Sequence, residues 1–158
     1  KPVTKVRANS GDASAQADEK GVIKITIDKP DDQVEVTVSG NGYREETVRF
    51  SALTKDVQKV KMVPSQKHVF VSKRSGKFDL YKIDADGKNE EIVLAGSGTE
   101  RDDMTLVAHP TKDLVAFVST REDKRNSDGF MLGTLNIIDL KDNKVNKIAQ
   151  SERVEVIG

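Results

Sequence analysis

Carboxylate and amide side chains around Gly87 come nearest to a metal site in this sequence. Residues 84–87 read Asp-Ala-Asp-Gly and Asn89 follows, and closely spaced oxygen side chains are the ligands that Ca²⁺ prefers. A calcium-loop register with Gly87 at the sixth position would begin at Lys82 and end at Val93, and neither residue supplies a carboxylate. Tight turns between strands require the same Asp and Gly residues. We therefore expect a turn here and assign no metal ligand.

Two adjacent carboxylates, Asp102 and Asp103, follow Arg101 and precede a predicted strand. A carboxylate pair can carry out acid–base chemistry or bind a metal. Neighbouring side chains on an extended chain point to opposite faces, however, so these two would not share one site. We expect a solvated loop or a cap at the start of the strand.

The histidines and the best-placed serine lack the partners that catalysis needs. His68 and His109 are the only histidines, whereas a catalytic zinc needs three protein ligands, so we expect packing or strand-edge roles. Ser97 lies directly between two glycines, but a nucleophile elbow has its glycines two residues away on either side. No glycine-rich nucleotide-binding motif occurs either. We therefore assign no catalytic, cofactor-binding or metal-binding residue, and we expect no cofactor.

The composition excludes several classes of partner. Lys plus Arg and Asp plus Glu each number 26, so the net charge is zero and nothing attracts nucleic acid electrostatically. The sequence contains no Cys, which rules out disulfides and thiol catalysis. No apolar run is long enough to span a membrane. The chain begins at Lys1 without an initiator Met, and we interpret it as a piece of a larger protein.

An internal repeat organises the second half of the chain. Residues 109–119, His-Pro-Thr-Lys-Asp-Leu-Val-Ala-Phe-Val-Ser, echo residues 63–72, Val-Pro-Ser-Gln-Lys-His-Val-Phe-Val-Ser. Pro64 and Pro110 are 46 residues apart, which is the length of one β-propeller blade. Blades form closed rings of roughly four to eight. This chain has room for only about two blades.

Alternating apolar and polar residues predict half-buried antiparallel strands along most of the chain. The predicted strands are 22–27, 34–38, 48–50, 57–62, 68–73, 78–84, 91–95, 105–109, 114–120, 134–140 and 144–149. Tight turns are predicted at 75–76, 86–87 and 142–143. Residues 122–129 are a polar insertion absent from the first repeat, which predicts a mobile loop. The only helical prediction is one turn within 51–58.

The first half resembles the carboxypeptidase regulatory-like domain, a small prealbumin-like β-sandwich. Residues 17–25, Ala-Asp-Glu-Lys-Gly-Val-Ile-Lys-Ile, are similar to one turn-and-strand motif of that family, with Ala17 in place of Thr and Ile23 in place of an aromatic residue. Residues 34–43, Val-Glu-Val-Thr-Val-Ser-Gly-Asn-Gly-Tyr, are similar to a second motif. Residues 1–3 match the segment after that family's first strand. The resemblance therefore implies a missing first strand and one open sheet edge.

The second half resembles TolB-like, or more broadly WD-type, β-propeller repeats. Residues 69–72 with 78–87, and residues 114–119 with 135–140, match the two strands of that repeat. The sequence departs from it by lacking the Trp before the Pro and by replacing the Asp-Gly turn with Gln-Lys and Lys-Asp. Residues 152–158 could begin a third blade or close the second.

These observations predict an all-β protein, with a β-sandwich at residues 1–64 and about two blades of an incomplete propeller at 65–158. The resemblances imply a non-catalytic structural or ligand- or protein-binding module of a larger bacterial envelope or secreted protein, and thus an extracytoplasmic location. Expected partners are another protein, the remaining blades, or a second copy bound through open sheet edges, without nucleic acid or a membrane span. One alternative is the gating propeller of a prolyl-oligopeptidase-type peptidase whose catalytic domain lies elsewhere. A calcium-stabilised adhesion module is the other.

Overall fold

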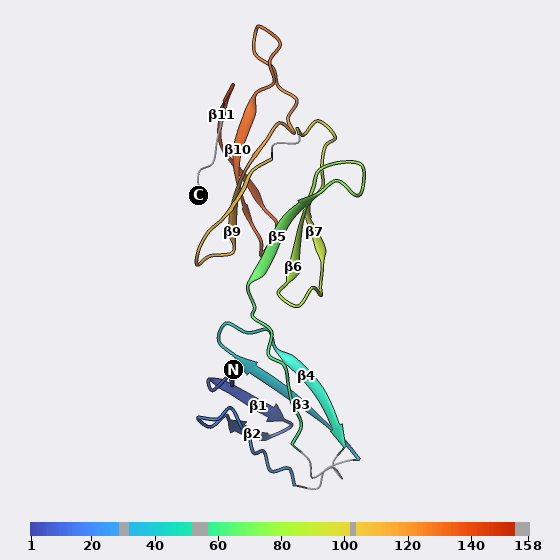
Figure 1. Ribbon diagram of the computed structural model, residues 1–158, viewed down its shortest axis with the longest axis vertical. Coiled ribbons are helices and arrows are strands. Elements are labelled where there is room, and N and C mark those ends of the chain that lie inside the picture. Colours follow the sequence, from blue (N-terminus) through green and yellow to red (C-terminus); the bar gives the residue numbers. More distant parts are fainter. Residues whose placement is uncertain (29–31, 52–56, 102–103, 154–158) are drawn as a thin grey trace. The chain divides into compact units, whose positions relative to one another are not determined.

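The computed structural model describes residues 1–28, 32–51, 57–101 and 104–153. The predicted all-β class is confirmed, because these ranges form eleven strands in three antiparallel sheets and contain no helix (Figure 1). In the same ranges, no helix is long and apolar enough to cross a membrane. The helical turn predicted within 51–58 falls mostly on residues outside the described part of the chain. The structure divides into unit 1, Lys1–Gln66, and unit 2, Lys67–Gly158.

Unit 1 is built on one four-stranded antiparallel sheet with the strand order β2-β1-β3-β4. Its strands are β1 (Val6–Ser10), β2 (Ala13–Gln16), β3 (Gln33–Gly40) and β4 (Glu46–Ser51). The period of two along β3 buries Val34, Val36 and Val38 on one face. Val6 and Ala8 of β1 join them in a single apolar cluster.

Strand prediction in unit 1 is right for β3 and β4 and wrong elsewhere. The hairpin of β1 and β2 was not predicted; its two-residue turn contains Gly11 at a φ of 53°, a conformation that glycine adopts without strain. The segments predicted as strands at 22–27 and 57–62 form no ladder. Their side chains nevertheless pack on the buried face of the sheet and give the unit a sandwich-like second layer. The contributing residues are Ile23, Ile27, Val60 and Met62.

Unit 2 contains two antiparallel meanders, a three-stranded sheet ordered β5-β6-β7 and a four-stranded sheet ordered β11-β10-β9-β8. Every strand predicted in this half is present to within two residues. The strands are β5 (Lys67–Ser72), β6 (Asp79–Asp84), β7 (Glu91–Leu94), β8 (Leu106–Ala108), β9 (Leu114–Ser119), β10 (Gly133–Asp139) and β11 (Val145–Ser151). Residues with positive φ occupy the predicted turns, namely Gly76, Gly87 and Asn143.

The core of unit 2 lies where the β5–β7 sheet packs on the β8–β11 sheet. The first sheet contributes Leu80 and Val93, and the second contributes Val115, Phe117 and Ile138. Phe117 and Ile138 have no exposed surface. We call the surfaces that meet at this core the inner faces of the two sheets, and the opposite surfaces their outer faces.

The polar insertion at 122–129 forms a hydrogen-bonded excursion between β9 and β10. The Oδ1 atom of Asn126 accepts hydrogen bonds from the backbone N–H groups of Asp128 and Phe130, at 3.0 and 2.8 Å. An isolated bridge between Arg125 and Met131 closes its base. The insertion thus has a defined turn conformation rather than an irregular path.

The two repeats of unit 2 differ by one strand. In the second repeat, β8 precedes the His-Pro pair and hydrogen-bonds to β9. The corresponding residues 60–62 of the first repeat instead contribute Val60 and Met62 to the cluster of unit 1. Among the described residues, β5 therefore pairs only with β6 and leaves its other edge open.

We expect Phe117→Ala to lower the free energy of unfolding of unit 2 by about 3–5 kcal/mol, because it empties a fully buried site between the sheets. The matched control is Phe130→Ala, since 68% of the surface of Phe130 is exposed and its removal should change stability by less than about 0.5 kcal/mol. Urea unfolding followed by circular dichroism measures both. Equal effects of the two substitutions would contradict the described core.

Candidate functional site

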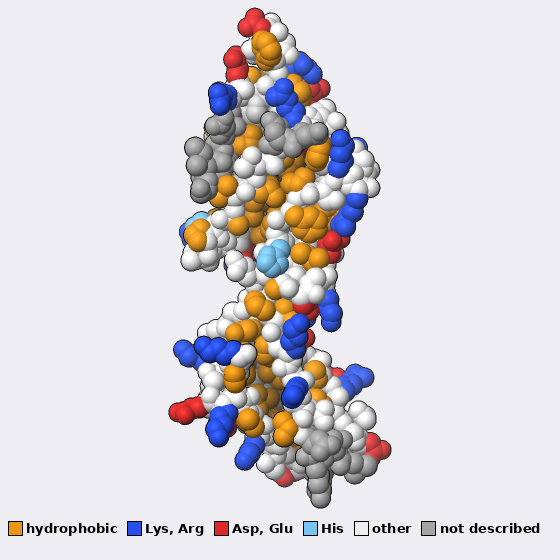
Figure 2. All heavy atoms as spheres, viewed as in Figure 1, with side chains coloured by type: hydrophobic (Ala, Val, Ile, Leu, Met, Phe, Trp, Pro, Cys, Tyr) orange, Lys and Arg blue, Asp and Glu red, His pale blue; other side chains and the backbone are white. Residues whose placement is uncertain are grey.

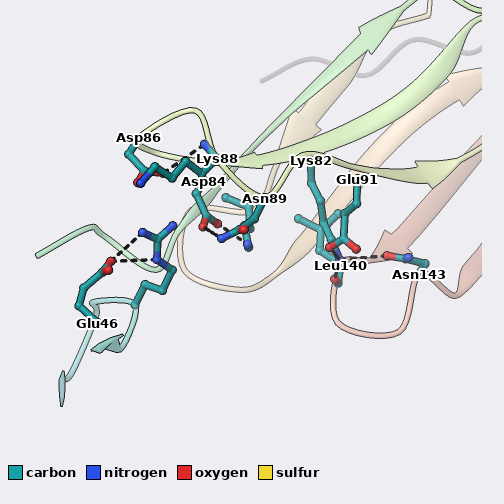
Figure 3. Close-up of polar contacts among 11 residues, drawn as sticks. Glu46, Lys82, Asp84, Asp86, Lys88, Asn89, Glu91, Leu140 and Asn143 are labelled. Carbon is teal, nitrogen blue, oxygen red and sulfur yellow. Dashed lines mark hydrogen bonds and ion pairs between the residues drawn. The ribbon is translucent and has the colours of Figure 1, made fainter. Parts of the chain in front are cut away.

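Lys82 is the most unusual polar residue of unit 2, because its ammonium group lies between the two sheets. It is on the inner face of β6, and only 8% of its side chain is exposed. Its Nζ donates to the carbonyl oxygen of Leu140 at 2.5 Å and to Oδ1 of Asn143 at 3.3 Å, and it forms an ion pair with Glu91 at 3.0 Å (Figure 3). Residues 58 positions apart are thereby connected. Each contact connects the lysine to another part of the fold, so its ammonium group has a structural role.

The Asp-Ala-Asp-Gly segment forms the predicted turn between β6 and β7. The N–H of Gly87 donates to the carbonyl of Asp84 at 2.9 Å, and the N–H of Lys88 donates to Oδ1 of Asp86 at 3.2 Å. The Asp84 carboxylate is buried and accepts a hydrogen bond from Asn89 at 2.7 Å (Figure 3). It also forms an ion pair with Lys67. In the described residues, no three His, Asp or Glu side chains group as metal ligands.

The remaining residues with catalytic potential are spread over separate loops and strands. His68 lies exposed on β5, and Nδ1 of His109 accepts from the backbone N–H groups of Thr111 and Lys112, both at 3.1 Å, which caps a turn. The hydroxyl of Ser97 bonds to a threonine hydroxyl at 2.7 Å. Asp102 and Asp103 lie outside the described residues. The structure brings none of the described ones together as a reactive pair.

A buried carboxylate that sequence reasoning missed holds the loop after β7. Glu100 accepts from the N–H groups of Ser97 at 2.6 Å and of Gly98 at 2.8 Å. Burial acts to raise the pKa of Glu100, but these backbone donors together outweigh it and hold the pKa below its usual range. The only sequence signal is a glutamate that closes a Gly-Ser-Gly-Thr turn.

Glu100 borders a hollow of about 230 Å³ at one end of the unit. Met104, Thr120 and Met131 also line it, together with the exposed Glu152. Its volume is below the roughly 300–1,000 Å³ of typical ligand pockets. Thr120 is occupied as well, because its hydroxyl donates to the carbonyl of Thr99 at 2.8 Å. Glu100 and Thr120 thus bond to the loop itself.

The outer face of the β5–β7 sheet carries a cluster of aromatic and apolar side chains. The rings of Phe70 and Tyr81 stack with centroids 5.5 Å apart, and the guanidinium of Arg74 lies 3.9 Å above the Tyr81 ring. Ile92, next to Tyr81 in the ladder, is 50% exposed. Ile83 lies beyond them and is half-buried. We call Phe70, Tyr81, Ile83 and Ile92 the aromatic face.

Buried hydrogen bonds fix the position of Tyr81 on this face. Its hydroxyl donates to Oδ2 of Asp79 at 3.2 Å, and the N–H of Gly96 donates to the other carboxylate oxygen at 2.7 Å. The Gly96 N–H makes the largest contribution to holding the pKa of Asp79 below its usual range. Asp79 stays ionised at neutral pH and anchors the phenol. Tyr81 is only 6% exposed, so its ring forms an ordered base for the more exposed side chains of this face.

The outer face of the β8–β11 sheet is aliphatic. Ala116 and Val118 alternate with the core residues of β9, and Leu135 and Ile137 alternate with those of β10. All four are half-buried, and none belongs to the core cluster of the unit. We call these four residues the aliphatic face. Figure 2 shows hydrophobic side chains reaching the surface of unit 2 on the side in view.

Comparison with protein-family models, curated proteins and solved structures gives no match to this chain. Within the described residues, unit 2 offers two outer faces with apolar side chains and open strand edges such as that of β5, while the buried Lys82, Asp84 and Glu100 are engaged in internal contacts.

We expect Lys82→Met to lower the free energy of unfolding by about 1–3 kcal/mol, because the buried carbonyl of Leu140 loses its donor. Methionine keeps the length and packing of the side chain. Lys88→Met, at an exposed position of the next turn, is the matched control and should be nearly neutral. Chemical denaturation measures both variants. An unchanged stability of Lys82→Met would show that the ammonium contributes nothing net.

We expect Glu100→Gln to lower stability at pH 7 by about 1–2 kcal/mol, because an amide offers the loop one acceptor in place of two. The lowered pKa of Glu100 means that its contribution is present above the ordinary glutamate pKa and is lost as the pH falls through the lower folded-state value. The variant should therefore lose less stability than the parent protein on acidification below about pH 4. Thermal melts across this pH range measure the difference. Asp128→Asn, at an exposed position, is the control, and parallel pH profiles of the parent and Glu100→Gln would contradict the assignment.

Proposed function

We propose that this protein is a non-catalytic binding module that associates with other β-sheet protein through the outer faces of unit 2. The observation that carries the proposal is that each sheet of unit 2 has apolar side chains on its outer face as well as on its inner face. An antiparallel sheet with one face in water alternates apolar and polar residues. Along β9 and β10, by contrast, the outer positions Ala116, Val118, Leu135 and Ile137 are as apolar as the inner ones.

Exposed apolar clusters on a folded protein typically mark interaction sites. The aromatic face is well suited to this role, because stacking and the Asp79 hydrogen bond order its rings before any partner arrives. Preorganisation of this kind lowers the entropy cost of binding. The open edge of β5 offers a second type of contact, the addition of a strand.

The non-catalytic part of the proposal is supported by how the reactive side chains are used. Lys82, Asp84 and Glu100 are buried and bonded to the fold. A catalytic group needs to reach a substrate atom at hydrogen-bond distance. The resemblance to modules of larger bacterial envelope or secreted proteins fits a binding role and makes an extracytoplasmic setting part of the proposal.

Photolabelling with a diazirine probe tests this function. In the purified protein at high dilution, we expect labelling of Ile92, Ile137 and the exposed control Phe130, and none of the buried control Phe117. In the native cell fraction, Ile92 and Ile137 should be protected while Phe130 continues to react. Equal labelling of the two isoleucines in both settings would overturn the proposal.

A further inference from the structure

The two sheets of unit 2 can be aligned strand by strand. Ser72 ends β5 and pairs with Asp79, whereas Ser119 ends β9 and pairs with Thr134. In this alignment Phe70 is equivalent to Phe117, and β6 is equivalent to residues 134–139 of β10. The pairing pattern continues without interruption along all four strands.

In this alignment, the two sheets meet through non-equivalent faces. Phe117 and Ile138 on the inner face of the β8–β11 sheet correspond to Phe70 and Ile83, which lie on the aromatic face of the β5–β7 sheet. The inner face of the β5–β7 sheet, represented by Leu80, corresponds in turn to the aliphatic face of the other sheet. The contact inside unit 2 is therefore heterologous, or head-to-tail.

In the repeat alignment, each of the two open faces is equivalent to one of the two faces that meet inside unit 2. We propose that a second copy of this chain docks head-to-tail, with its aromatic face on the aliphatic face of the first copy. This inference rests on the proposed binding function and names its partner. The internal packing of the two sheets provides the template, because it shows that surfaces of these two types fit together.

The side chains at the proposed contact are compatible with burial. Lys82 on the inner face of β6 corresponds to Ile137 on the aliphatic face, so an apolar side chain takes the place of the buried ammonium of Lys82. Arg74 covers Tyr81 and pairs with Glu90. Phe70, Ile83 and Ile92 therefore form the apolar contact surface of the aromatic face. Tyr81 packs beside them under Arg74.

A head-to-tail contact leaves one aromatic and one aliphatic face free on every dimer, so assembly continues until a ring closes. Rings of sheets packed face to face contain about four to eight sheets. Unit 2 supplies two sheets per copy, so closure is expected at roughly two to four copies. The prediction is a defined small oligomer that forms with increasing concentration.

Sedimentation velocity over a concentration series tests the proposal. The parent protein should shift from monomer to a small oligomer as its concentration rises. Ile137→Lys blocks the aliphatic face and Ile92→Lys blocks the aromatic face, so each variant alone should remain monomeric. Phe130→Lys, at the exposed tip of the insertion between β9 and β10, is the matched control and should assemble like the parent. Near-parent thermal melts will establish that the variants are folded.

Mixing the two blocked variants gives the decisive result. Ile137→Lys keeps its aromatic face and Ile92→Lys keeps its aliphatic face, so the mixture should form a one-to-one dimer and nothing larger. A mixture that stays monomeric, or an oligomer that both variants still form, overturns the head-to-tail contact.

A parent protein that is monomeric at every concentration overturns the second copy as partner. The labelling experiment then separates the two proposals. If Ile92 and Ile137 are still protected in the native fraction, the binding module stands with a different partner, and if they are not, both proposals fail.

Discussion

The packing of the β5–β7 sheet on the β8–β11 sheet is the interaction on which the rest of unit 2 depends. Neither meander has enough buried surface to be stable alone, since an isolated small sheet needs a partner for its apolar face. Full burial of each large aliphatic or aromatic side chain contributes roughly 1.5–3 kcal/mol, and Phe117, Leu80 and Ile138 are buried almost completely. This contact also decides which face of each sheet is left outside.

Buried polar groups inside this contact are hydrogen-bonded, and one of them, Lys82, connects the two sheets. Thr134 donates to the carbonyl of Ser119 at 2.9 Å, and the amide of Asn136 donates to the hydroxyl of Thr134 at 2.9 Å. Lys82 adds its bond to the carbonyl of Leu140. The first two bonds lie within the β8–β11 sheet, whereas the Lys82 bond reaches this sheet from β6. Because an unpaired buried polar group costs about 1–3 kcal/mol, a sliding of one sheet over the other would be penalised at Lys82. These bonds give the buried polar groups a structural role.

The strands of unit 2 could be predicted because each has alternating residues bounded by a turn with its own signal, such as the glycine at position 87. In unit 1 the alternation at 22–27 was misleading. It reports that Ile23 and Ile27 face a core, which they do, but it contains no information on whether a neighbouring strand offers an edge for pairing. The hairpin of β1 and β2 went unnoticed because only Val6 and Ala8 carry its buried face.

The sequence could not reveal the candidate site in the same way. The turn at Asp84 is local and was predictable, whereas the role of Lys82 depends on a carbonyl 58 residues away. A lysine in a strand normally signals an exposed face, and only the partner sheet shows that this one is enclosed. The two apolar outer faces could not be predicted for a similar reason. Alternation marks a buried side of a strand but does not show which layer covers it.

One extra residue between the proline and the strand of the second repeat decides which faces of the two sheets are equivalent. The two prolines are 46 residues apart, but the matching strands β5 and β9 are offset by 47, because the second repeat has one more residue between the proline and its strand. Since side chains alternate with a period of two, a shift of one residue exchanges the faces of a strand. With the offset of 46, Phe117 would correspond to Val71 and the sheets would meet through equivalent faces, which closes a two-fold pair. With the offset of 47, Phe117 corresponds to Phe70, the contact is head-to-tail, and each sheet is left with a face complementary to the other.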